Sequence, residues 1–324
     1  MTGPPSPTPP PPPEGTRWDS AYHAPVLVDA VVELLGGARR VLDGTLGGGG
    51  HSLALLESGA TVTGIDRDPE ALAEATARVA RTGRQDRFRV LPGNYAQLDE
   101  IPSLADERFD GILLDLGISS HQIDAPERGF TFREGAPLDM RMRREDSPSA
   151  AELLNGAPEA ELARLFRDYG DEPRAARLAR EIVRRRGNRP FTTSDDLVGA
   201  IRGALGPRTG PPDFARLFQA VRIAVNDELS GLERALPVLR ERLTAGGVLA
   251  VIAYHSGEDR LVKHAMREWS RACICPPRQP VCTCRGRELG ELITRRPITA
   301  GPDETARNPR ARSAHLRAWR RSAV

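Results

Sequence analysis

Short β-rich runs alternate with helical patterns along the first third of the chain. A helical pattern of Ala, Leu, Glu and Arg fills residues 69–82, between the second and third of these runs. Strands that alternate with helices are typical of a parallel sheet with helices on its faces. The pattern therefore predicts an α/β fold in which four strands form half of a doubly wound sheet, at residues 41–43, 61–66, 88–91 and 111–115.

The hydrophobic pattern changes after Gln122. A polar stretch rich in Gly, Pro and Arg leads into helical segments from Ala150 to about Leu205, with no convincing strand. Sheet character returns at residues 245–254, between helical patterns over 228–243 and 258–269. A helical stretch between two parts of a sheet predicts a helical domain inserted into the α/β core.

Four segments follow from this organisation. Residues 1–20 are rich in proline and offer nothing to bury, so we expect a disordered tail. We expect the core in two parts, 21–125 and 216–324, the second with a Cys-rich loop at 273–284. Residues 126–215 are the predicted helical insertion, for which we expect a role in substrate recognition.

Composition and charge narrow the class of protein. Hydrophobic residues make up 39% of the chain and charged residues 28%, which is typical of a soluble globular protein, and no apolar run is long enough to span a bilayer. The tail lacks the features of a secretory signal, so we expect a cytoplasmic location and no membrane partner.

Net charge is only +2, but the charges are segregated. Seven arginines and one glutamate lie between residues 174 and 189, and 15 Arg and Lys against 5 Asp and Glu lie from residue 260 onward. These stretches indicate either solvated faces or a surface for RNA phosphates. Charge alone leaves both interpretations open.

A glycine-rich turn follows the first predicted strand. Asp43 ends that strand, four glycines follow at 47–50, and Asp66 ends the next strand, 19 residues beyond Gly47. Bare backbone lets a nucleotide-like ligand approach, and a carboxylate at that spacing can accept hydrogen bonds from ribose hydroxyls. The structural alternatives are a flexible loop for the glycines and, for Asp66, a charge at a helix N-terminus. Together the two features predict a cofactor that contains adenosine.

Spacing narrows the choice of cofactor. A dinucleotide turn needs glycine or alanine at its third position, where this chain has Ser52, and the chain has no Gly-Lys-Ser/Thr phosphate loop. An NAD-dependent dehydrogenase is therefore disfavoured. S-adenosylmethionine carries no phosphate, so it fits a glycine turn that lacks the spacing needed to bind a pyrophosphate.

The end of the fourth strand, from Asp115 to Gln122, should lie beside the cofactor. Methylation at C5 of cytosine needs a cysteine nucleophile there, but all four cysteines lie between 273 and 284. Methylation of an exocyclic amine needs only positioning and a proton acceptor. Asp115 suits either proton acceptance or cofactor contact, and we favour cofactor contact.

Eight ordered blocks of sequence span essentially everything after the tail. They are residues 23–27, 43–52, 64–69, 115–120, 137–142, 218–223, 255–260 and 308–313. Among them, Asp115-Leu-Gly-Ile-Ser-Ser and Pro137-Leu-Asp-Met-Arg-Met stand out. Together the blocks resemble the MraW family of ribosomal RNA methyltransferases.

The resemblance implies N4-methylation of a cytidine in the decoding region of 16S rRNA, at position 1402 in the family's usual description, with S-adenosylmethionine as donor. It also implies a class I, Rossmann-like methyltransferase core with an inserted helical domain. The implied partner is 16S rRNA in the small ribosomal subunit or a late assembly intermediate, and a homodimer is left open. Carried over by motif, the implied cofactor residues are Gly49, Gly50, His51, Asp66, Tyr95, Asp115 and Gln122.

Other family blocks indicate substrate contacts. Asp139, Arg141, His255, Ser256 and Asp259 are expected to line the cytidine pocket or to grip neighbouring phosphates, with Asp139 as a second candidate for the proton acceptor. The alternative is that they form salt bridges between the insertion and the core. The segment 308–312 suits either a basic strap on RNA or a packed turn.

The cysteines form two pairs. Cys273, Cys275, Cys282 and Cys284 offer four soft ligands that suit tetrahedral zinc. One residue separates the members of each pair, rather than the two that are usual in zinc knuckles. A structural zinc and reduced free thiols therefore both remain open.

A second class of function also fits the motifs. An assembly factor that binds RNA and S-adenosylmethionine without catalysis would keep the glycine turn and Asp66. The intact strand end at Asp115 favours the enzyme.

Overall fold

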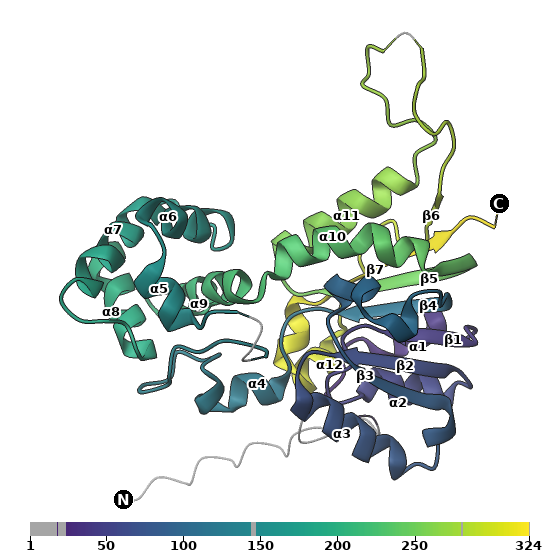
Figure 1. Ribbon diagram of the computed structural model, residues 1–324, viewed down its shortest axis with the longest axis horizontal. Coiled ribbons are helices and arrows are strands. Elements are labelled where there is room, and N and C mark those ends of the chain that lie inside the picture. Colours follow the sequence, from purple (N-terminus) through teal and green to yellow (C-terminus); the bar gives the residue numbers. More distant parts are fainter. Residues whose placement is uncertain (1–17, 19–23, 144–146, 280, 324) are drawn as a thin grey trace, which may run out of the picture.

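The computed structural model describes residue 18 and residues 24–143, 147–279 and 281–323 (Figure 1). The predicted disordered tail, except Trp18, lies outside the described residues.

A seven-stranded sheet forms the centre of the molecule, in the order β3-β2-β1-β4-β5-β7-β6. The first five strands of that order are parallel, and β7 runs antiparallel to both β5 and β6. The strands are β1 (Arg40–Asp43), β2 (Thr61–Asp66), β3 (Phe88–Pro92), β4 (Phe109–Asp115), β5 (Leu243–Ala253), β6 (Gly290–Leu292) and β7 (His315–Arg321).

Helices cover both faces of the sheet, as the pattern predicts. Successive residues of a strand point to opposite faces, so Leu113 of β4 packs on one face while Ile112 and Leu114 pack on the other. The first face is covered by α1 (Val28–Leu35), α2 (Gly50–Glu57) and α3 (Pro69–Ala80). The second face is covered by α10 (Glu228–Glu241) and α11 (Ser256–Trp269).

A group of helices lies to one side of the sheet (Figure 1). These helices are α5 (Ala150–Gly156), α6 (Glu159–Asp168), α7 (Ala175–Arg186), α8 (Ser194–Leu205) and α9 (Pro211–Asn226). They bury a hydrophobic cluster of their own, which is separate from the two clusters of the sheet. We call α5–α9 the helical unit.

Helix α9 crosses the predicted boundary between residues 215 and 216. Its Phe218, Val221 and Val225 belong to the cluster of the helical unit, and Asp227, with φ at 51°, separates α9 from α10. We therefore propose that the helical unit extends to Asn226.

The structure also has two short helices outside the helical unit, α4 (Ser120–Asp124) and α12 (Pro302–Arg307).

Among the described residues, none of the helices has both the length and the apolar character needed to cross a membrane.

Candidate functional site

A pocket opens at the carboxyl ends of β1, β2, β4 and β5. The sheet order reverses direction between β1 and β4, and ligands of open α/β sheets bind at such a point. The pocket is lined by residues 44–47, Gly50, His51, Asp66, Arg67, Ala71, 93–96, 115–119, Gln122, Met142, 226–228, Tyr254 and Glu258.

Backbone conformation requires the glycines of the turn after β1. Gly47 and Gly49 have φ of +49° and +73°, in the left-handed region that favours glycine. A Cβ atom at Gly50 would lie 2.9 Å from Pro25, so the close packing of the turn also excludes a side chain there. Gly50 lines the pocket, whereas Gly49 is the N-cap of α2 and is not among the lining residues.

Asp66 ties this turn to the end of β2. Its carboxylate accepts hydrogen bonds from the backbone N–H groups of Gly47, at 2.8 Å, and Asp68, at 2.9 Å. Burial raises the pKa of Asp66 to about 6, although both hydrogen bonds favour the ionised form. The N-cap of α3 is Asp68, whose side chain accepts a hydrogen bond from the backbone N–H of Glu70, so Asp66 is not the residue that caps this helix.

Asp115 lies where three strand ends meet. Its Oδ1 accepts a hydrogen bond from the Tyr254 hydroxyl at 2.8 Å, and its Oδ2 lies 3.7 Å from Nδ1 of His51. Its backbone N–H donates to the Thr45 hydroxyl at 2.6 Å. Burial and the neighbouring Asp115 raise the pKa of Tyr254, so this phenol stays a hydrogen-bond donor at neutral pH.

One ring nitrogen of His51 contacts a backbone carbonyl. Its Nε2 lies 2.8 Å from the carbonyl oxygen of Val26, which only accepts, so Nε2 carries the hydrogen. Beneath it, Asp43 is fully buried and accepts a hydrogen bond from the Ser52 hydroxyl at 2.7 Å. Burial raises the pKa of Asp43, and the nearby His51 opposes that rise. The contact with Val26 orients the His51 ring in the pocket lining.

Two further predicted cofactor residues line the pocket. Tyr95 begins the 3₁₀ helix η2 (Tyr95–Glu100), and burial raises the pKa of its hydroxyl. The Gln122 side chain accepts from the backbone N–H of Ser119 at 3.0 Å and donates to Asp68 at 2.9 Å, which holds α4 against the start of α3.

The α9–α10 junction and the start of α11 add acidic groups that the sequence did not single out. Both oxygens of Glu228 accept from the guanidinium of Arg222, at 2.9 and 2.8 Å, and the buried Glu258 accepts from the backbone N–H of Tyr254 at 2.9 Å. These acids come from different elements, so only the tertiary structure shows that they lie together.

The predicted substrate residue His255 lies between these acids. Its Nε2 is buried and lies 3.2 Å from Oε1 of Glu258, without the alignment of a hydrogen bond. The ligand atoms of Glu228, His255 and Glu258 lie within 4.8 Å of one another, as in a metal site. Because Arg222 already neutralises Glu228, this cluster is poorly suited to a cation.

The other predicted substrate residues lie outside the pocket lining. Asp139 and Arg141 pair with each other through contacts of 2.6 and 3.1 Å, and Asp259 pairs with Arg317 of β7 at 2.7 and 3.0 Å. The first pair lies within one loop and the second joins α11 to β7, so neither pair joins the helical unit to the sheet. Ser256 is exposed at the start of α11. Their roles toward a substrate stay predictions.

The loop that holds Asp139 and Arg141 reaches the pocket through Met142. The backbone N–H of Met142 donates to the Asn226 side chain at 2.9 Å, and the Asn226 amide donates to the carbonyl of Met140 at 2.7 Å. Asn226 therefore fastens this loop to the end of α9, and both Asn226 and Met142 line the pocket.

Comparison with known proteins agrees with this architecture. Residues 20–322 match the MraW methylase family. A relative from Gemmatimonas aurantiaca, named Ribosomal RNA small subunit methyltransferase H, is 65% identical over 299 residues, which cover 92% of this chain and 95% of the relative. A relative of the same name from Heliobacterium modesticaldum is 48% identical over 307 residues, 92% of this chain and 97% of the relative.

These matches confirm the resemblance that the eight sequence blocks indicate, and the seven-stranded sheet confirms the predicted α/β class with a class I methyltransferase core. Because the match spans nearly the whole chain, this protein belongs to the MraW methylase family.

Proposed function

We propose that this chain transfers a methyl group from S-adenosylmethionine to the exocyclic N4 of a cytidine in the decoding region of 16S rRNA. The observation that carries the proposal is the pocket at the carboxyl edge of the sheet, in which the glycine turn, Asp66 and Asp115 converge. Relatives named as small-subunit rRNA methyltransferases, at up to 65% identity, support the choice of RNA.

Asp66 and Asp115 are assigned to different parts of the cofactor, Asp66 to its ribose. Asp66 uses two of its lone pairs on backbone N–H groups, and a carboxylate has about four, so it keeps capacity for the ribose hydroxyls. We assign adenine stacking to Tyr95, an aromatic residue of the pocket lining. The glycine backbone lets the cofactor lie close to the sheet edge.

Asp115 is assigned to the cofactor's amino acid portion. Tyr254 and His51 both lie against its carboxylate, which fixes the direction of its negative charge. An ammonium group placed there would gain a charge-assisted hydrogen bond. Asp139 is less suited to accept the proton from N4, because Arg141 already pairs with it.

The bound cofactor would supply an electrophilic methyl group on its sulfonium. The chain's task is then to bring the N4 lone pair in line with that methyl and to exclude other orientations of the base. No cysteine is among the residues described as lining the pocket, so covalent activation of the ring at C6 is disfavoured. We assign the approach of the cytidine to the side of Met142 and Tyr254, where Arg141, His255 and Ser256 are close in sequence.

Methyl transfer to purified small subunits tests the proposal. The subunits are taken from cells that lack this modification, incubated with labelled S-adenosylmethionine, digested to nucleosides and analysed by mass spectrometry. We expect N4-methylcytidine, and we expect Asp115→Asn to lower the rate at least tenfold while Arg320→Ala, in β7 and outside the pocket lining, leaves it unchanged.

The outcomes separate two classes of function. Binding of both ligands without transfer to any particle would favour the non-catalytic assembly factor. Label on another base would contradict the proposed specificity.

Because the proposed substrate is ribosomal RNA, the proposal includes a cytoplasmic location. Sedimentation of the purified chain decides the open question of a homodimer.

A further inference from the structure

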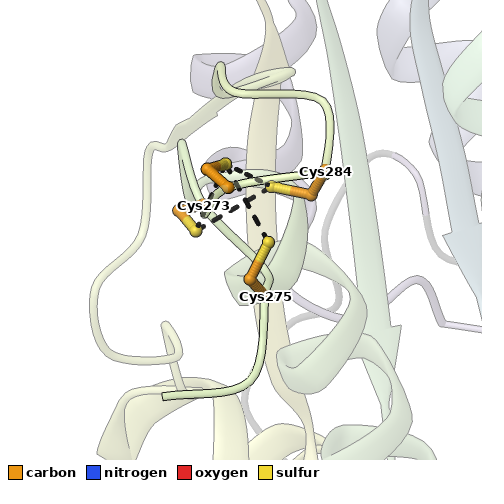
Figure 2. Close-up of side chains that lie close together, drawn as sticks. Cys273, Cys275 and Cys284 are labelled. Carbon is orange, nitrogen blue, oxygen red and sulfur yellow. Dashed lines mark hydrogen bonds between the residues drawn. The ribbon is translucent and has the colours of Figure 1, made fainter. Parts of the chain in front are cut away.

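All four cysteines gather in the loop between α11 and β6, away from the pocket lining (Figure 1). We call residues 270–289 the cysteine loop. Figure 2 shows Cys273, Cys275 and Cys284 turned toward a common centre. The Sγ atoms of all four lie within 4.8 Å of one another.

The separations between these sulfur atoms match a tetrahedral ion. Cys282 lies 3.9 Å from Cys273, 3.9 Å from Cys275 and 3.5 Å from Cys284, and Cys284 lies 3.8 Å from Cys273. Zinc–sulfur bonds of about 2.3 Å in a tetrahedron place the sulfur atoms roughly 3.8 Å apart. An iron–sulfur cluster would hold its thiolates farther apart, because iron and sulfide lie between them.

The one-residue spacing within each pair suits this arrangement. In an extended segment, residues two apart point to the same side, so a single spacer lets both sulfurs of a pair face inward. The spacer Ile274 is 41% exposed, which agrees with an outward direction. Its backbone N–H lies 3.4 Å from Sγ of Cys284, the kind of donor that stabilises a bound thiolate.

Little else orders the cysteine loop. No residue that the structure describes between 270 and 289 is buried, and Val281 is 68% exposed. Its base is anchored by Leu289, whose N–H donates to the carbonyl of Trp269 at 2.8 Å, and by Arg285, which donates to the carbonyl of Arg271 at 3.2 Å. Long loops without a core need another source of order, and a metal cross-link supplies one.

We propose that Cys273, Cys275, Cys282 and Cys284 hold one structural Zn²⁺. Binding converts four thiols into four thiolates and releases four protons, which leaves a site of charge −2. Arginines 271, 278, 285 and 287 of the same loop offset that charge. All four positions around the ion are filled by protein, so it leaves no position for a substrate.

Metal analysis of the full chain tests the proposal. The protein is purified without a metal-affinity tag, under reductant, and analysed by plasma mass spectrometry. We expect about one zinc per chain, four thiols that resist a thiol reagent, and release of zinc when an organomercurial is added. Every thiol signal reports this site, because the chain has four cysteines in all.

Two variants sharpen the test. Cys282→Ser removes the sulfur at the centre of the shortest contacts and is expected to lose at least nine tenths of the zinc. Val281→Ser adds a hydroxyl to the neighbouring exposed residue and should keep the full zinc content. Exchange of the wild-type chain into Co²⁺ should give the absorption bands of tetrahedral cobalt thiolate.

Proteolysis gives an independent measurement. Removal of zinc should speed tryptic cleavage at Arg278 at least tenfold while the rest of the chain persists. A zinc-free chain with four reactive thiols that takes up no Co²⁺ would overturn the proposal. So would bound iron in place of zinc, or a disulfide in protein kept under reductant. None of these measurements depends on methyl transfer.

Discussion

At the scale of single residues, Asp66 has a structural role in the fold and a proposed role in cofactor binding. It anchors the turn after β1 through the N–H of Gly47, and it lines the pocket where the cofactor's ribose is expected. Burial raises its pKa to about 6, so the carboxyl group is protonated in mildly acidic solution. Ribose hydroxyls donate, and a hydrogen bond to an ionised carboxylate is stronger than one to a neutral carboxyl group.

We therefore predict that cofactor binding weakens as the pH falls below about 6, where binding must release the proton from Asp66. The dissociation constant, measured by calorimetry from pH 7.5 to 5, should approach a tenfold rise for each pH unit at the acidic end. Asp66→Asn should bind more weakly at pH 7.5, by about 1–3 kcal/mol, and should lack the step near pH 6. Equal pH profiles for the two proteins would remove Asp66 from the ribose site.

At the scale of elements, a buried glutamate joins three parts of the helical unit. Glu172 lies between α6 and α7 with 2% of its surface exposed, and it accepts from the backbone N–H of Arg174 at 3.0 Å and from Arg216 of α9 at 2.7 Å. Burial by itself would raise the pKa of Glu172, but these arginine contacts lower it overall. The ionised form therefore stabilises the unit.

Replacement of Glu172 by Ala should destabilise the helical unit by about 1–3 kcal/mol, because the arginine partners lose their acceptor. Urea unfolding followed by circular dichroism measures this, with Glu161→Ala, on the exposed face of α6, as the control. Since the folded pKa is lowered, the stabilisation is present above the unfolded value of 4.5 and is lost as the pH falls through the folded pKa. Equal midpoints for the two variants at pH 7 would contradict the assignment.

The elements also show where prediction from sequence stops. The first five strands follow from their runs of Val, Ile and Leu, but β6 has three residues and β7 carries three arginines, so neither has a strand-like hydrophobic pattern. In β7, Arg317 is buried through its pair with Asp259, and Trp319 is fully buried. Pairing with β5, and not local preference, makes this segment a strand.

At the scale of the whole molecule, the segregated charges divide into two kinds. Six of the seven arginines between 174 and 189 contact groups within the helical unit; Arg186, for example, donates to the carbonyls of Leu154 and Ala157. Most arginines of that stretch are therefore already paired within the helical unit, while the side chains of Arg184 and Arg189 stay exposed. Arg307 and Arg312 are instead exposed on either side of Arg310, which pairs at 3.0 Å with Asp124 at the end of α4.

Helix α4 also supplies Gln122 to the pocket, so the segment from Arg307 to Arg312 contacts an element of the site through Arg310. We predict that their double replacement by Ala weakens binding to small subunits and lowers the slope of log affinity against log salt by about 1.4–1.8, since each phosphate contact contributes about 0.7–0.9. Filter binding over a salt series measures both. Arg320→Ala, which breaks the exposed pair with Glu291, is the control and should keep the wild-type slope. An unchanged slope in the double variant would exclude these arginines from the RNA surface.

The sequence by itself predicted the positions of the strands β1–β5 and the helical patterns between them, and it favoured S-adenosylmethionine as the cofactor. Those features depend on local signals: the period of apolar residues, glycines at a strand end, and the spacing from Gly47 to Asp66. Family blocks then indicated the RNA base. The roles assigned to Asp115, Gln122 and the other site residues stay predictions that the experiments above address.

Only the tertiary structure decided which distant side chains meet. Tyr254 and Asp115 are 139 residues apart, yet the pairing of β4 with β5 brings the hydroxyl within 2.8 Å of the carboxylate. The same holds for Glu228 and Glu258, for the extent of α9, and for the four sulfur atoms of the cysteine loop. Contacts of this kind depend on how elements pack across the molecule, and the pattern along a single segment carries no information about that packing.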